Sequence, residues 1–129
     1  MVLKELEVFQ CETCGNQVSL LEQGPGELVC CGKPMKLLVA NSTDASTEKH
    51  VPVYEMLGNS DMLIRVGGVD HPMTEEHHIG WIAVVYQNSI IHEFLEPGAA
   101  PQITIKIDNG YTGKIYAWCN LHGLWVAEL

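Results

Sequence analysis

All five cysteines of this chain stand in groups with the spacing of metal ligands. The groups are Cys11 with Cys14, Cys30 with Cys31, and Cys119 three residues before His122. Because each cysteine has a place in such a group, none is spare for a disulfide. The sequence therefore predicts a carrier of two metal centres.

Composition limits what can surround these centres. With 129 residues, of which 47% are hydrophobic, the chain can bury one ordinary core plus a small appendage. The net charge of -9 argues against binding to nucleic acid or to anionic membrane surfaces. No stretch reaches the roughly 20 apolar residues of a membrane span, and the first residues do not resemble a signal peptide. We therefore expect a cytoplasmic protein, in which thiols stay reduced.

The first part of the chain is a compositional unit of its own. Residues 1–38 are rich in glycine and hold four of the five cysteines. A segment this small cannot build a sufficient apolar core and needs a staple such as a metal ion. Glu27–Val29 is expected to be a short strand that delivers the second cysteine pair. Residues 41–48 are small and polar, so the domain boundary is placed near them and 39–129 form the second domain.

The second domain shows short apolar runs rich in β-branched residues, separated by turn sequences. The predicted strands are Val51–Tyr54, Met62–Val66, Ile79–Tyr86, Ser89–Leu95, Gln102–Ile107, Gly113–Cys119 and Leu124–Ala127. No segment has sustained helical periodicity. The fold class is therefore all-β, with a small metal-binding domain followed by an immunoglobulin-like antiparallel β-sandwich of about seven strands.

Four thiolates from a Cys-x-x-Cys pair and an adjacent pair indicate a tetrahedral all-sulfur site. Cys30 and Cys31 are direct neighbours, so both sulfurs must be turned toward one ion and the tetrahedron is expected to be distorted. Thiolates suit both zinc and iron, and the spacing leaves this choice open. A zinc clip that only holds the small domain together is the simplest alternative.

Histidines from several element ends predict the second site. His50 begins a strand, His71 and His77 flank one polar loop, and Cys119 and His122 flank a turn. One side of a sandwich could bring these five ligands together. Mixed imidazole and thiolate ligands suit iron, copper or zinc. Five ligands would leave one position open, as in a reactive rather than a structural site.

These motifs, taken together and in order, resemble a known family. They are Cys11-Glu12-Thr13-Cys14-Gly15-Asn16, Leu28-Val29-Cys30-Cys31-Gly32-Lys33-Pro34-Met35, Glu48-Lys49-His50-Val51-Pro52, His71-Pro72-Met73 with a second histidine six positions after the first, and Cys119-Asn120-Leu121-His122-Gly123-Leu124-Trp125. The chain resembles desulfoferrodoxin, the two-iron class of superoxide reductase, and its first domain resembles the desulforedoxin-like domain of that family. Residues 60–70 and 88–112 follow the family less closely.

The resemblance implies two iron ions per chain. One would be held by Cys11, Cys14, Cys30 and Cys31, and the other by four equatorial nitrogens from His50, His71, His77 and His122 with Cys119 as the axial sulfur. Glu48 is similar to a glutamate that can take the sixth position in the oxidised state, and Lys49 to a lysine beside the open face. The implied activity is the one-electron reduction of superoxide to hydrogen peroxide without dismutation. A small electron donor such as rubredoxin and a homodimer are also implied.

Some choices stay open at this stage. Extended backbone would point His77 and His78 to opposite faces, so the residues alone do not decide between them; the spacing in the family favours His77. His78 is then a neighbour of the site or a surface residue, and His92 is expected to be structural. Two alternative functions remain. One is a non-catalytic metal-binding module, built as a zinc ribbon on an immunoglobulin-like domain, and the other is a pure electron carrier that uses the first iron.

Overall fold

The structure, a computed structural model, describes residues 5–42, 50–68, 70–107 and 110–129. Contacts within the chain divide it into a smaller unit, Glu5–Val39, and a larger unit that includes Ala40–Leu129. Every helix or strand assigned in the described ranges is a β-strand, which confirms the all-β prediction. Across these ranges, no helix is long and apolar enough to cross a membrane.

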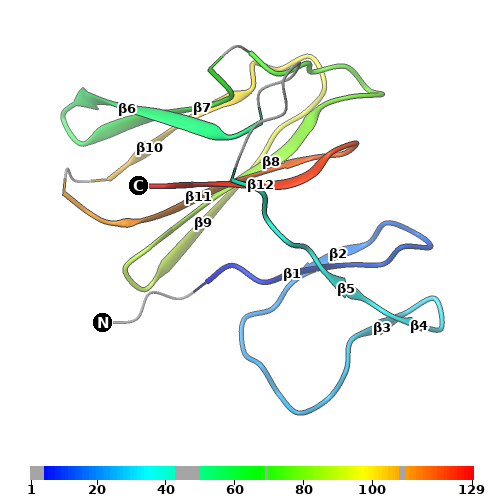
Figure 1. The fold of residues 1–129 in the computed structure, drawn as a ribbon. Helices are drawn as coiled ribbons and strands as arrows, with labels where there is room; N and C mark the ends of the chain where they lie inside the picture. The colour runs from blue at the N-terminus through cyan, green and yellow to red at the C-terminus, as the bar shows by residue number, and fades with distance from the viewer. Residues whose placement is uncertain (1–4, 43–49, 69, 108–109) are drawn as a thin grey trace. The chain divides into compact units, whose positions relative to one another are not determined.

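The described part of the larger unit contains seven strands in two antiparallel sheets, which lie as two layers in Figure 1. One sheet has the order β10-β7-β6 and the other β12-β11-β8-β9. The strands are β6 Pro52–Gly58, β7 Asp61–Val66, β8 Ile79–Tyr86, β9 Ser89–Phe94, β10 Gln102–Lys106, β11 Gly113–Cys119 and β12 Gly123–Glu128. The predicted sandwich is confirmed, and each predicted strand overlaps one of these seven.

The core lies between the two sheets and is built by alternation along the strands. In β10, Ile103 and Ile105 are buried whereas Gln102, Thr104 and Lys106 are exposed. Strands β7 and β11 contribute further buried side chains to the same cluster, namely Met62, Ile64, Val66, Ile115, Ala117 and Cys119. The cysteine at the end of β11 is therefore fixed by its place in the packed core.

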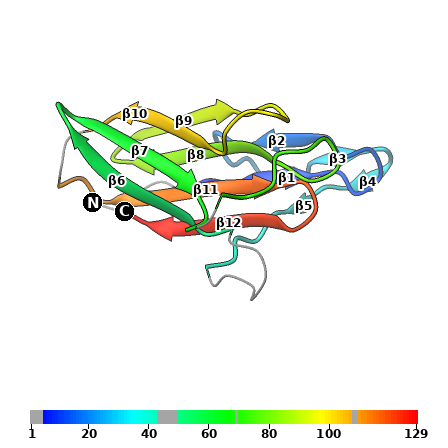
Figure 2. The same cartoon turned by 90° about the horizontal axis from the view of Figure 1, so that it is seen from above.

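One end of the sandwich collects the segments that carry the histidines. The start of β6 pairs with the end of β7 (Pro52 with Val66), and the start of β8 pairs with the end of β11 (Ile79 with Cys119). The β7–β8 loop and the β11–β12 turn consequently lie on the same side of the sandwich, opposite the β6–β7 turn (Figures 1 and 2). Antiparallel pairing thus brings together residues far apart in sequence.

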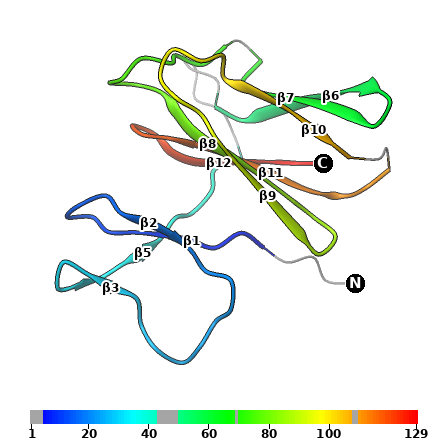
Figure 3. The same ribbon diagram turned by 180° about the vertical axis from the view of Figure 1, so that it is seen from behind.

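The pairing of β8 with β11 is irregular next to this end. Trp118 pairs with Trp81 and Cys119 with Ile79, so the register shifts across Gly80. A Cβ atom at Gly80 would lie 2.8 Å from the Trp118 ring, which shows that the ring occupies the space a side chain would need. Figure 3 shows this sheet from behind, with the long β8–β9 hairpin. The absence of a side chain at Gly80 allows the register between β8 and β11 to shift just before Cys119.

The smaller unit is built from short strands. Within residues 5–39 they are β1 Val8–Gln10, β2 Gln17–Ser19, β3 Val29–Cys30, β4 Lys33–Pro34 and β5 Lys36–Leu37. Strands β2, β1 and β5 form one sheet, and β3 pairs with β4 as a hairpin. The strand expected at Glu27–Val29 begins only at Val29 and includes Cys30, because its pairing is set by the tight β3–β4 turn.

Candidate metal centres

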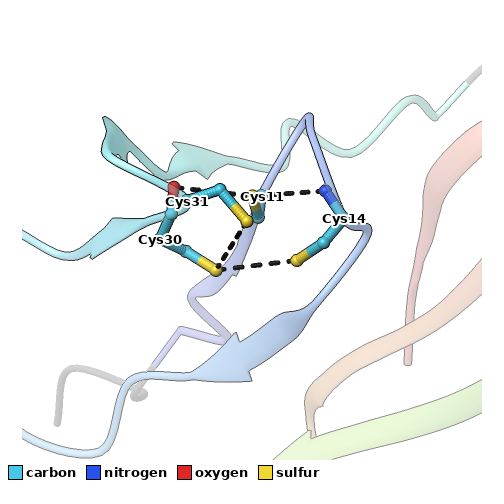
Figure 4. A group of neighbouring side chains, drawn as sticks. All are labelled: Cys11, Cys14, Cys30 and Cys31. Atoms are coloured by element: carbon cyan, nitrogen blue, oxygen red, sulfur yellow. Dashed lines mark hydrogen bonds between the residues drawn. The ribbon is translucent and has the colours of Figure 1, made fainter.

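The first candidate centre joins two loops of the smaller unit. Cys11 follows β1, and the turn after it is closed by hydrogen bonds from Gly15 N–H to Cys11 O and from Cys11 N–H to Asn16 O, both 2.9 Å. Cys30 and Cys31 come from the β3–β4 hairpin. The structure brings the four sulfur atoms within 4.8 Å of one another, and Figure 4 shows the side chains converging from the two loops.

The adjacent pair, Cys30 and Cys31, is turned so that both sulfur atoms lie in the same group. The sulfur of Cys30 lies 3.6 Å from that of Cys14 and 4.0 Å from that of Cys31. Cys31 has a φ of 54°, in the left-handed region that non-glycine residues rarely adopt. This backbone conformation turns two neighbouring side chains to the same point. No disulfide joins the five cysteines, all of which lie in described segments.

The thiols of this group affect one another's ionisation. The pKa of Cys11 is lowered to about 6, chiefly by the hydrogen bond that Cys14 N–H donates to Cys11 Sγ at 3.5 Å. The side chains of Cys14, Cys11 and Cys30, in that order, raise the pKa of Cys31 to about 12. The Cys14 and Cys11 side chains likewise raise the pKa of Cys30. Four thiolates this close need a cation among them, and four sulfur donors suit iron.

The second candidate centre lies at the end of the sandwich described above. His50, His71, His77 and Cys119 offer ligand atoms that all lie within 4.8 Å of one another. His50, His71 and Cys119 are buried, and His77 is half-buried. His50 precedes β6, the other two histidines come from the β7–β8 loop, and Cys119 ends β11.

The His122 ring completes a square of imidazoles. Neighbouring ring centroids lie 4.6 Å apart for His50 and His71, 4.7 Å for His71 and His77, 5.0 Å for His77 and His122, and 4.9 Å for His122 and His50. The His50–His77 diagonal, 6.4 Å, exceeds every side. His122 is exposed and its Nδ1 lies 3.8 Å from Cys119 Sγ, so the square is open to solvent at this corner.

Neighbouring groups fix how two of these rings are turned. His71 Nδ1 lies 2.8 Å from the carbonyl oxygen of Pro72. The His50 ring is stacked on the Trp125 ring, with centroids 4.6 Å apart and an interplanar angle of 14°. Such contacts hold imidazoles in one orientation before any ion is bound. Several neutral imidazoles and one thiolate form a donor set that fits iron.

The remaining predicted residues lie apart from this group or outside the described residues. Glu48 and Lys49 are among the residues that the structure does not describe. His78 Nδ1 faces the carbonyl oxygens of Thr74 and Glu75, at 3.0 and 3.2 Å. His92 lies in β9 with its ring 5.6 Å from that of Trp81, and burial lowers its pKa.

Sequence reasoning missed two residues that contact the second centre or the loop carrying His77. These are Trp125, which stacks on His50, and Asn120, which makes hydrogen bonds to residues on both sides of His77. Both residues stand in the motif Cys119–Trp125, which carries part of the family resemblance and is the sequence feature that could have indicated them. Nothing in its residue types alone indicates these contacts.

Comparison with known proteins gives matches along nearly the whole chain. The family model described as "Desulfoferrodoxin" matches residues 42–128, and that described as "Desulfoferrodoxin, N-terminal domain" matches residues 3–38. The chain is 47% identical to a desulfoferrodoxin of Syntrophotalea carbinolica over 125 residues, which are 97% of this chain and 98% of the relative.

Two further similarities are to proteins named superoxide reductase. A superoxide reductase of Pyrococcus horikoshii is 35% identical over 105 residues, covering 68% of this chain and 91% of that protein. The crystal structure of the superoxide reductase from Treponema pallidum matches with a TM-score of 0.75 and 27% identity, covering 95% of this chain and 97% of that one.

Proposed function

The chain belongs to the desulfoferrodoxin family, and from this premise we propose that it is a superoxide reductase. It reduces superoxide to hydrogen peroxide with one electron and two protons, and it does not dismutate the substrate. The histidines and Cys119 of the second centre would hold a ferrous ion, which would supply the electron. Two irons belong to each chain, one at the four cysteines and one at the histidines and Cys119.

The square of four imidazole rings beside the Cys119 sulfur carries this proposal. His50, His71, His77 and His122 would offer four nitrogens around one ion, and Cys119 one sulfur. Five donors would leave a coordination position for a small ligand on an ion that accepts six. A structural zinc site would be closed by four ligands instead.

The ligands of the second centre differ in burial, so the centre has a buried side and a solvent-exposed side. Cys119 is fully buried in the core, whereas His122 is exposed and His77 half-buried. Bound to iron as a thiolate, Cys119 would donate electron density to the ion, which would favour transfer of an electron to the substrate. The exposed corner gives a small anion and water-borne protons access to the rings.

Lys49 and Glu48 are proposed as residues of the reaction on the basis of the sequence. Lys49 directly precedes His50, so its charge is attached next to a ligand. The net charge of -9 repels an anion at long range, but the Debye length is about 8 Å at physiological ionic strength and distant carboxylates are screened. A nearby lysine would therefore attract superoxide, and Glu48 would take the open position after oxidation.

The electron donor, the oligomeric state and the cellular location of the enzyme are proposed from the family resemblance and from the clustered thiols. The first iron would receive electrons from a small donor of the rubredoxin type, or would mainly hold the smaller unit. We propose a homodimer, as the resemblance implies, and a cytoplasmic location, because four clustered thiols persist as metal ligands where disulfides are kept reduced. Analytical ultracentrifugation and cell fractionation test these two proposals.

Metal analysis combined with superoxide decay tests the function. The purified protein should contain iron at both centres and be coloured when oxidised. After reduction it should consume superoxide from a radiolysis pulse with no oxygen evolution at an oxygen electrode. A colourless zinc protein would support the metal-binding alternative, and oxygen release would indicate dismutation; either result would refute the proposal.

A further inference from the structure

Asn120 links the two segments that carry His77 and Cys119. Its side-chain Oδ1 accepts a hydrogen bond from His78 N–H at 2.8 Å, and its Nδ2 donates one to the carbonyl oxygen of Glu76 at 3.0 Å. Its own backbone N–H donates to the carbonyl oxygen of His78 at 3.1 Å. These partners are the residues directly before and after His77, more than 40 positions away in sequence.

The β7–β8 loop also has hydrogen bonds of its own. Thr74 Oγ1 accepts a hydrogen bond from His77 N–H at 3.1 Å, and Thr74 N–H donates to His77 O at 2.9 Å. These bonds shape the loop but stay within it. They do not fix the distance from His77 to Cys119, whereas the bonds of Asn120 cross between the two segments.

We infer that Asn120 is a positioning residue of the second iron site. Its carboxamide holds the loop on both sides of His77 against the turn that begins at Cys119, so that the imidazole and the thiolate meet at one ion. This inference rests on the proposed function, because it requires both residues to bind the same iron. Both polar atoms of the Asn120 side chain are used in hydrogen bonds to the loop.

The carboxamide suits this role because it uses both of its ends at once. Oδ1 can only accept and Nδ2 can only donate, and the two partners are an N–H and a carbonyl oxygen. Without these bonds the residues on either side of His77 would be less firmly held against the turn, and holding them there when the ion binds would lower the affinity. Loss of a residue that orients metal ligands lowers metal affinity by about 10- to 100-fold.

Iron affinity in three variants tests the inference. Asn120→Ala removes both side-chain bonds, Asn120→Asp keeps an acceptor for His78 N–H but loses the donor to Glu76, and Asn88→Ala changes an exposed asparagine in the β8–β9 turn at the opposite end of β8. Ferrous ion is titrated anaerobically against a chelator. Second-site iron is measured after oxidation from the visible absorption that is present in the unchanged protein and that Cys119→Ser is expected to abolish. Iron at the four cysteines of the same molecules is the internal reference.

We expect second-site affinity to fall about 10- to 100-fold in Asn120→Ala and less in Asn120→Asp, with Asn88→Ala and the four-cysteine site unchanged. Equal affinity in Asn120→Ala and the original protein would overturn the inference. So would a lower unfolding midpoint of the metal-free protein without a change in affinity, since that indicates a merely structural role. If Asn120→Ala does not fold, Asn120→Asp decides. An original protein that binds no iron at the second site would refute the proposed function itself.

Discussion

At the scale of single residues, His71 shows how one hydrogen bond selects the nitrogen offered to a metal. Its Nδ1 lies 2.8 Å from the Pro72 carbonyl oxygen, which can only accept. Nδ1 must therefore carry the proton, and Nε2 keeps the lone pair that binds an ion. The buried ring cannot turn over without losing this bond. The tautomer needed for ligation is thus set by the chain before iron arrives.

Replacing Cys119 by serine should remove the sulfur ligand while keeping nearly the same volume. We expect Cys119→Ser to lose the sulfur-to-iron absorption of the oxidised second site, because that transition requires a thiolate. The visible spectrum of the oxidised protein measures this. Cys14→Ser, which changes a thiol of the other centre, is the matched control and should keep the band. A band that survives in Cys119→Ser would contradict the ligand assignment.

Lys49→Ala tests local attraction of the substrate. Removing one positive charge beside His50 should slow the bimolecular reaction with superoxide by about threefold to tenfold and flatten its dependence on ionic strength. Pulse radiolysis at several salt concentrations measures both effects. Lys114→Ala makes the same charge change at the other end of β11 from Cys119 and should have a smaller effect. Equal rates for Lys49→Ala and the unchanged protein would exclude the steering role.

The sequence predicted which residues would gather better than it predicted what holds them. His50, His71, His77 and Cys119 could be expected together because they stand at element ends and match a family pattern. The two hydrogen bonds of the Asn120 side chain could not be expected, because its partners are 42 and 44 positions away and an amide has many possible partners. Side-chain contacts of this kind depend on the fold.

At the scale of elements, strands were predictable where burial imposes a pattern. The runs at 79–86 and 113–119 were predicted with the bounds that the structure gives to β8 and β11. Strand β6 was predicted at Val51–Tyr54 but extends over Pro52–Gly58, because Glu55 and Met56 also pair with β7. Its far half is largely exposed and lacks the apolar alternation on which prediction depends.

Gly113 provides a test of the contact between β8 and β11. A Cβ atom at this position would collide with the carbonyl oxygen of Val85, and backbone cannot move aside as a flexible side chain can. We expect Gly113→Ala to lower the free energy of unfolding by about 1–3 kcal/mol. Urea unfolding measures this. Gly68→Ala, where the space is open, is the control and should change stability little; equal effects of the two substitutions would contradict the packing argument.

At the scale of the whole molecule, the two units differ in what stabilises them. Among its described residues, the smaller unit buries the apolar side chains of Leu6 and Val8 together with Cys11. The larger unit has a continuous core drawn from both sheets. A segment with so little buried apolar surface depends on bound metal for its folding free energy. The larger unit does not depend on its metal in this way.

This difference predicts how the chain responds to loss of the first iron. Cys14→Ser removes one of four sulfur ligands, so iron should leave that centre and residues 5–39 should lose protection from hydrogen exchange. The larger unit should keep its protection and its second-site absorption. It should also still react with superoxide when the protein is first reduced chemically and superoxide is then added.

Hydrogen exchange followed by mass spectrometry measures protection separately in residues 5–39 and in the larger unit, and pulse radiolysis measures the reaction with superoxide. Cys119→Ser should abolish the second-site absorption but leave both units protected, because the larger unit has a packed core of its own. If residues 5–39 stayed protected in Cys14→Ser, bound metal would not be what stabilises the smaller unit. If Cys14→Ser abolished the reaction with superoxide, the first iron would be part of the catalytic step.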